Sequence, residues 1–296
     1  MDIYLKLDPP TANVTFLDIT YSHGDVIRTD VGEYEAIQVK CPGDCSMTGS
    51  LVAASKPVAV FTVSDMIGSP DYPARDNFME QLPPVEAYGR HFIVKQEPHR
   101  LKNTVCSYKP FYCNDLVLIV ASEINTTVSV AIDSTVYNHH LDTAGQALML
   151  VVEGDIMQIL SDCAVLVIQV LRSIPGDDGG MLVVSPLEHY SSHDVIMFQP
   201  QTLSADKQVV VYTSDTPAPV IEVDGTARVF DGQINGPLFN VSYLVVNYTG
   251  GTSTSTDVRV SSFGRFGGYV SDIGDEEKIT SLGHSRKQIN AVSYLM

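Results

Sequence analysis

Basic residues are scarce in this chain of 296 residues, which has 18 Lys and Arg against 35 Asp and Glu and a net charge of −17. A nucleic-acid-binding protein neutralises phosphates with Lys and Arg, and an anionic membrane attracts basic clusters. Long apolar runs are also missing. The longest, residues 147–152 and 163–168, are far shorter than the roughly 20 residues of a membrane helix. We therefore expect no nucleic-acid partner and no membrane insertion.

Sequence signatures of catalysis are missing too. There is no nucleophile elbow, phosphate loop, dinucleotide fingerprint or zinc-protease motif. His189 and His193 are four residues apart, but the Ser-Ser between them favours a loop over a metal-binding helix face. The glycine-rich residues 264–269 have no adjoining helix pattern, so they indicate a turn or bulge. The sequence predicts a protein that is not an enzyme and that requires no cofactor.

One pair of carboxylates supports an alternative in which the chain is a hydrolase acting on glycans. Glu80 and Glu86 flank a Pro-Pro turn, and a glycosidase needs two carboxyl groups about 5–10 Å apart. In the simpler interpretation, which we favour, Glu80 is a structural carboxylate that accepts backbone N–H bonds from the loop it closes. Lys56 and Arg90 are its candidate partners.

Three acidic loops are candidate calcium sites, at residues 71–76, at Asp177 and Asp178, and at residues 272–277. Calcium takes six to eight oxygen ligands from carboxylates and carbonyls. None of the loops matches an EF-hand, and solvated acidic turns explain them as well.

The five cysteines suggest local disulfides. Cys41 and Cys45, and likewise Cys106 and Cys113, bracket a turn-forming proline, so each pair is expected to close a small loop. Without a CxxC pair or a nearby His pair, the spacing does not indicate zinc. Cys163 lies in an apolar run and is expected to be a small buried hydrophobic residue.

Four N-x-S/T sequons favour a secreted glycoprotein; they lie at Asn13, Asn125, Asn240 and Asn247. The first residues have neither the positive n-region nor the apolar h-region of a signal peptide. We therefore expect the sequence to be a fragment or an incomplete gene model of an extracellular protein, with an intracellular protein as the alternative.

Almost every segment has the composition of a β-strand. Short runs of Val, Ile, Thr, Tyr and Phe are bounded by Gly, Pro, Asn, Asp and Ser. The expected strands are residues 13–19, 36–40, 58–63, 116–121, 127–132, 165–170, 209–213, 220–223, 242–247 and 257–261. The best helical candidate is residues 76–81, one or two turns before the Pro-Pro stop. The expected fold class is all-β.

A loose repeat divides the chain. Ser55, Ser161 and Ser261 each follow a short strand-like run and precede another, and they are spaced by about 100 residues. This period predicts tandem β-sandwich-like units at residues 1–100, 101–200 and 201–296, with a β-propeller of two blades per period as the alternative. Residues 174–198 also match residues 67–94 in the order of their parts: an acidic loop, then Pro, an acidic residue, Tyr and a strand.

Several of these blocks resemble the N-terminal domain of the IgG Fc-binding protein family, found in large mucus and extracellular glycoproteins. The resemblance covers about residues 53–274 and includes residues 55–61, 161–173, 176–186 and 258–274. Its most specific string, EQLPPV, is formed by Glu80, Gln81, Leu82, Pro83, Pro84 and Val85.

The chain departs from the family pattern at three points. Met66 and Arg75 stand where family members usually have a cysteine pair, and Tyr88-Gly89 replaces the usual Trp-Gly. The cysteine-rich von Willebrand-type repeats that accompany the domain in mucus proteins are not in this sequence, so their assembly role is not carried over.

The resemblance implies a secreted, non-enzymatic module for adhesion, mucus or innate defence that binds protein or glycan partners. A structural spacer in a larger secreted protein is the remaining alternative. The residues themselves suggest that the Pro-Pro turn is a joint between two β units.

Overall fold

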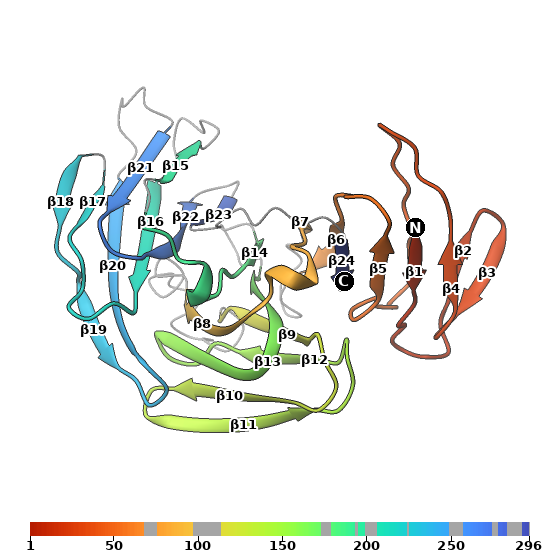
Figure 1. Cartoon of the computed structure of the whole chain (residues 1–296), viewed down its shortest axis with the longest axis horizontal. Helices are drawn as coiled ribbons and strands as arrows, with labels where there is room; N and C mark the ends of the chain where they lie inside the picture. Colours follow the sequence, from red (N-terminus) through yellow and green to blue (C-terminus); the bar gives the residue numbers. More distant parts are fainter. Residues whose placement is uncertain are drawn as a thin grey trace.

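The computed structural model of the protein describes residues 1–67, 76–96, 114–172, 179–192, 195–198, 206–223, 225–248, 257–273, 278–282 and 292–295. Within these ranges the chain consists of β-strands with two short 3-10 helices (Figure 1). The predicted all-β class is confirmed. No helix among these residues is long and apolar enough to cross a membrane.

The N-terminal part contains one four-stranded sheet and two hairpins. The sheet has the order β24 (Val292–Leu295), β5 (Leu51–Ala54), β1 (Asp2–Tyr4) and β4 (Val26–Arg28). One hairpin pairs β2 (Asn13–Phe16) with β3 (Ile19–Ser22), and the other pairs β6 (Phe61–Ile67) with β7 (Asp76–Gln81). The last strand of the chain therefore returns to the sheet that contains the first.

The middle of the molecule is a seven-stranded sheet centred on β13 (Ile156–Leu171). This strand is 16 residues long and pairs with β8, β9, β10 and β14. The other six strands are β8 (Gly89–Lys95), β9 (Leu116–Ala121), β10 (Thr126–Ile132), β11 (Thr135–Leu141), β12 (Ala147–Val151) and β14 (Gly180–Val183). Ser161, expected in a break between two strands, lies inside β13.

The C-terminal part is a β-sandwich. One sheet is β15 (Val195–Phe198), β21 (Asp257–Ser262), β17 (Ile221–Val223) and β18 (Thr226–Arg228). The other is β19 (Gly232–Asn235), β20 (Asn240–Tyr248), β16 (Asp206–Thr213), β22 (Gly267–Ile273) and β23 (Lys278–Leu282). Side chains from both sheets share one core that includes Val209, Val223, Val246 and Val260. Because side chains alternate along each strand, one face of each sheet is buried against the other sheet.

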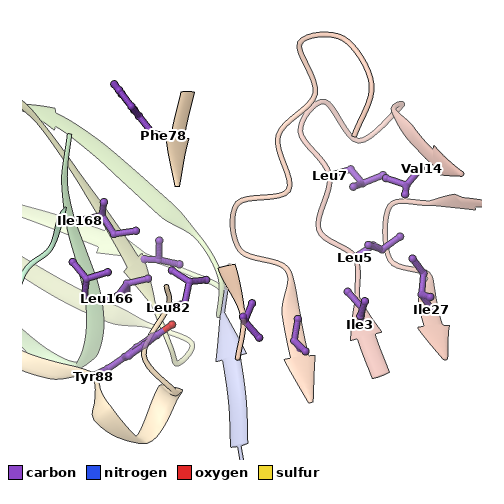
Figure 2. Close-up of a cluster of buried hydrophobic side chains, with 14 of the residues drawn as sticks. Ile3, Leu5, Leu7, Val14, Ile27, Phe78, Leu82, Tyr88, Leu166 and Ile168 are labelled. Carbon is purple, nitrogen blue, oxygen red and sulfur yellow. The ribbon is translucent and has the colours of Figure 1, made fainter. Parts of the chain in front are cut away.

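Two further apolar clusters bind the three parts together. Val210, Tyr212 and Tyr269, on the other face of the β16 sheet, pack with Ile93 and Leu182 of the middle sheet. Another cluster joins the middle sheet to the N-terminal part. Figure 2 shows Leu82, Tyr88, Leu166 and Ile168 on one side of this cluster and Ile3, Leu5, Leu7, Val14 and Ile27 on the other.

Three sequence-based element assignments are corrected. Residues 76–81, the helical candidate, form strand β7, because alternate residues meet solvent and core: Phe78 is buried and Met79 is exposed. Residues 13–19 are not one strand but a hairpin, since Leu17 and Asp18 both have positive φ, as a tight two-residue turn requires.

The third correction concerns residues 36–40, which were expected to form a strand but carry no ladder. Ile37 and Val39 do point toward the N-terminal core. Alternate residues of this segment are thus half-buried, as in a strand, although none of the described strands pairs with it.

The expected unit boundaries at residues 100 and 200 stay a prediction. Strand pairing crosses the first of them, because β8 pairs with β13. The seven-stranded and five-stranded sheets differ from the four-stranded blades of the alternative, a propeller.

Candidate interaction site

The EQLPPV string begins at the end of β7 and ends at the first residue of the 3-10 helix η1 (Val85–Ala87). The Leu82 N–H still donates to the Val60 carbonyl at 2.9 Å, after which Pro83 and Pro84 end the pairing. Pro84 is extended, with φ −66° and ψ 155°, and its carbonyl accepts the Ala87 N–H at 2.8 Å. Leu82 and Tyr88 are buried in the cluster of Figure 2, so both ends of the turn are fixed.

A second turn with the same geometry follows β14. In the helix η3 (Leu187–His189), the extended Pro186 accepts the His189 N–H at 2.9 Å, and Tyr190 is buried after the helix. The two turns touch, because Gly89 lies so close to Pro186 that a Cβ at position 89 would collide with the proline ring. The matching order of parts in the two segments therefore corresponds to two equivalent proline turns packed together.

Glu188 connects the second turn to β8. Its Oε1 accepts the Arg90 N–H at 3.1 Å and lies 2.8 Å from Nδ1 of His91. Burial alone would raise the pKa of Glu188, but the hydrogen bonds and charge of His91 and the Arg90 N–H together hold that pKa below its ordinary value. Sequence reasoning assigned Glu188 no role, although the equivalent order of parts in the two Pro segments had pointed to it.

Glu80 lies on β7, opposite Thr62 of β6. Burial raises the pKa of Glu80 to about 7, and a backbone hydrogen bond from Gln81 offsets part of this effect. No ion pair links Glu80 to Lys56 or Arg90 among the described residues, and Arg90 instead offers its backbone N–H to Glu188. Glu86 is exposed on η1, and no hydrogen bond in the described ranges joins it to Glu80.

The same hairpin carries exposed apolar side chains. Phe61, Val63 and Met79 are 51%, 53% and 67% exposed. Val63 pairs directly with Met79, and Phe61 pairs with Gln81, so the three apolar side chains lie on one face of the ribbon. Phe78, on the opposite face, is buried. We call Phe61, Val63 and Met79 the hairpin patch.

The predicted metal sites receive no support from the described residues, among which no cluster of three His, Cys, Asp or Glu side chains is suited to a metal ion. His189 is buried in η3, and His193 lies outside the described residues. Most of the three acidic loops, including Asp177 and Asp178, also lies outside them.

The cysteines and sequons are only partly described. Cys41 and Cys45 form the predicted disulfide, with Cα atoms 5.5 Å apart. The second predicted disulfide stays a prediction, because Cys106 and Cys113 lie outside the described residues. Cys163 is a free thiol on β13 and is half-buried rather than buried as expected; it lies where the pairing of β13 with β8 shifts register, between Leu160 and Val165. Of the sequons, Asn13, Asn125 and Asn240 are exposed and accessible to a glycan; the side chain of Asn247 is outside the description.

Comparison with known protein families identifies a match over most of the chain. The family model described as IgGFc binding protein matches residues 5–271, which is most of the chain and includes both proline turns and the hairpin patch. No curated protein and no solved structure matches the chain.

Proposed function

The chain belongs to the IgGFc binding protein family, and from this membership we propose that it is a non-enzymatic, extracellular module that binds a protein partner through the hairpin patch. The observation that carries the proposal is the family match over residues 5–271. The hairpin patch supplies a surface suited to such binding.

Three features of the hairpin patch favour a protein partner over a glycan. Its side chains are aromatic or aliphatic, and Gln81, which pairs with Phe61, is uncharged as well. Adjacent exposed apolar side chains are typical of protein interfaces, whose cores are poor in charged residues. The buried Leu82 and Tyr88 hold the segment that follows β7 against the middle sheet, so the patch is presented on a supported ribbon.

The test uses the Fc fragment of immunoglobulin G, the partner that the family name suggests. The double variant Val63→Thr/Met79→Gln replaces two patch side chains by polar ones of similar shape. We expect binding measured by surface plasmon resonance to weaken at least about tenfold, or 1.4 kcal/mol, a typical loss for central interface residues. Val220→Thr/Val229→Thr is the matched control, since both valines are exposed elsewhere, at 63% and 88%.

Other outcomes discriminate between the alternatives. Equal Fc affinity of the patch variant and the control would contradict the patch as the binding surface. Glycan-array binding without Fc binding would identify a glycan partner. The raised pKa of Glu80 is the one feature that favours a hydrolase, because a general acid must be protonated near neutral pH. Glycan turnover that Glu80→Gln abolishes without unfolding the chain would replace the binding proposal.

A further inference from the structure

The strand β12 forms a free edge of the middle sheet. Among the described strands it pairs with β9 alone. The Val152 N–H donates to the Asp115 carbonyl, and the Ala121 N–H donates to the Gln146 carbonyl. In an antiparallel ladder these bonds alternate along the strand, so the even-numbered residues of β12 face β9. The N–H and C=O groups of Ala147, Met149 and Val151 therefore point outward, and no described residue bonds to them.

This edge lacks the features that normally prevent strands from pairing with other chains. Natural edge strands carry charges, prolines or bulges, but β12 reads Ala-Leu-Met-Leu-Val and pairs with β9 in regular register. Met149 is 63% exposed. The opposite edge of the same sheet, β11, carries Asn138, His139 and His140. Of the two strands β11 and β12 that end the main strand order, only β12 is thus apolar along its whole length.

The two ends of β12 carry opposite charges. At the start, Nζ of Lys6 donates to the Ala144 carbonyl and to Oγ1 of Thr143, each at 3.4 Å. At the far end, Glu153 is exposed. Antiparallel pairing of two identical strands about Met149 places Glu153 of one copy opposite Gly145 of the other, beside its Lys6. The edge is therefore complementary to itself in hydrogen bonding and in charge.

We propose that two copies of this chain associate through antiparallel pairing of their β12 strands, which joins the two middle sheets into one. Met149 lies on the two-fold axis, Ala147 pairs with Val151 of the second copy, and Lys6 meets Glu153 at each end. The interface is isologous and closes at two subunits. It leaves the hairpin patch free and holds independently of the partner proposed above.

The first test is the oligomeric state of the whole chain, measured by analytical ultracentrifugation over about a hundredfold range of concentration. We expect a monomer–dimer equilibrium. Met149→Lys places two ammonium groups opposite each other on the axis and should raise the dissociation constant at least tenfold. Val220→Lys, at an apolar residue that is also 63% exposed but lies outside the middle sheet, should leave it unchanged. The melting temperature of each variant verifies that it is folded.

Charge exchange makes the register testable. Lys6→Glu and Glu153→Lys should each weaken the dimer. The double variant Lys6→Glu/Glu153→Lys should restore its affinity, because the two charges are again opposite. Amide hydrogen exchange adds a readout for the alternate residues: Ala147, Met149 and Val151 should become protected as concentration rises, while Leu148 and Leu150 are protected throughout. A chain that stays monomeric overturns the proposal and leaves a partner's strand as the occupant of the edge. A dimer unaffected by Met149→Lys also overturns it.

Discussion

Burial changes the protonation equilibrium of Glu80. A carboxyl group in a partly dehydrated position prefers its neutral form, and the pKa of Glu80 rises to about 7 from an ordinary 4.5. The folded protein therefore holds the proton more tightly than the unfolded chain does. As pH rises from 4.5 to 7, the unfolded state gives up this proton first, and the stability of the fold decreases.

Glu80→Gln should remove this pH-dependent cost. We expect the variant to melt a few degrees above the parent protein at about pH 8. Near pH 4 the two should melt at the same temperature, because the Glu80 carboxyl group is then mostly protonated in both the folded and the unfolded protein. Scanning calorimetry at both values checks this. Glu86→Gln, at an exposed position of the same loop, controls for loss of one negative charge. A variant that is less stable than the parent at pH 8 would contradict the argument.

At the residue scale, sequence reasoning succeeded where the cause is local. The Cys41–Cys45 disulfide follows from two thiols bracketing a tight turn. The contact of Glu188 with His91 joins residues 97 apart in the chain, and the approach of Gly89 to Pro186 is similarly distant. Such contacts depend on how two turns pack, which no local pattern specifies.

At the element scale, the Glu188 contact fixes η3 to β8. Because the pKa of Glu188 is lower in the folded protein than its ordinary value of 4.5, its ionised form stabilises the fold. This stabilisation is present above pH 4.5 and is lost as pH falls through the lower, folded value.

Glu188→Gln should consequently destabilise the protein near neutral pH, by on the order of 0.5 kcal/mol, since the side chain is 38% exposed. The difference from the parent should shrink toward zero in acid. Urea titrations at several pH values measure it, with Glu222→Gln on the exposed side of β17 as the control. A difference that grows in acid would refute the assignment.

Two of the wrong element assignments, at residues 36–40 and 76–81, share one cause. A local pattern marks the apolar residues of a segment, and Ile37 and Val39 do pack against the core. It does not reveal whether another strand lies alongside, and β7 is a strand because β6 pairs with it. The Pro-Pro stop was predicted correctly because proline ends a ladder and a helix alike.

At the scale of the whole molecule, the net charge of −17 acts against compactness. Like charges on a folded surface repel one another, and added salt screens this repulsion. Raising the NaCl concentration from about 20 mM to about 500 mM should raise the melting temperature by several degrees. Scanning calorimetry over this salt series measures the effect. Lower stability in high salt would mean that attractive ion pairs dominate.

The all-β class could be read from the sequence because strand composition is spread along the chain. The arrangement of sheets could not, since β13 takes partners from segments before and after it in the chain. Likewise, β24 pairs with β5 across most of the sequence. These long-range pairings gather the middle of the chain into one sheet and bring its last strand back to its first.

The position of β24 has a mechanical consequence. Because β1 and β24 both run antiparallel to β5, with Asp2 and Ser293 each opposite Ala53, the two terminal strands are parallel to each other (Figure 1). A force pulling the two ends apart therefore loads the β1–β5–β24 ladder in shear, along the strands, and all of its hydrogen bonds share the load. The middle sheet and the C-terminal sandwich lie outside this line of tension and remain folded until the ladder gives way.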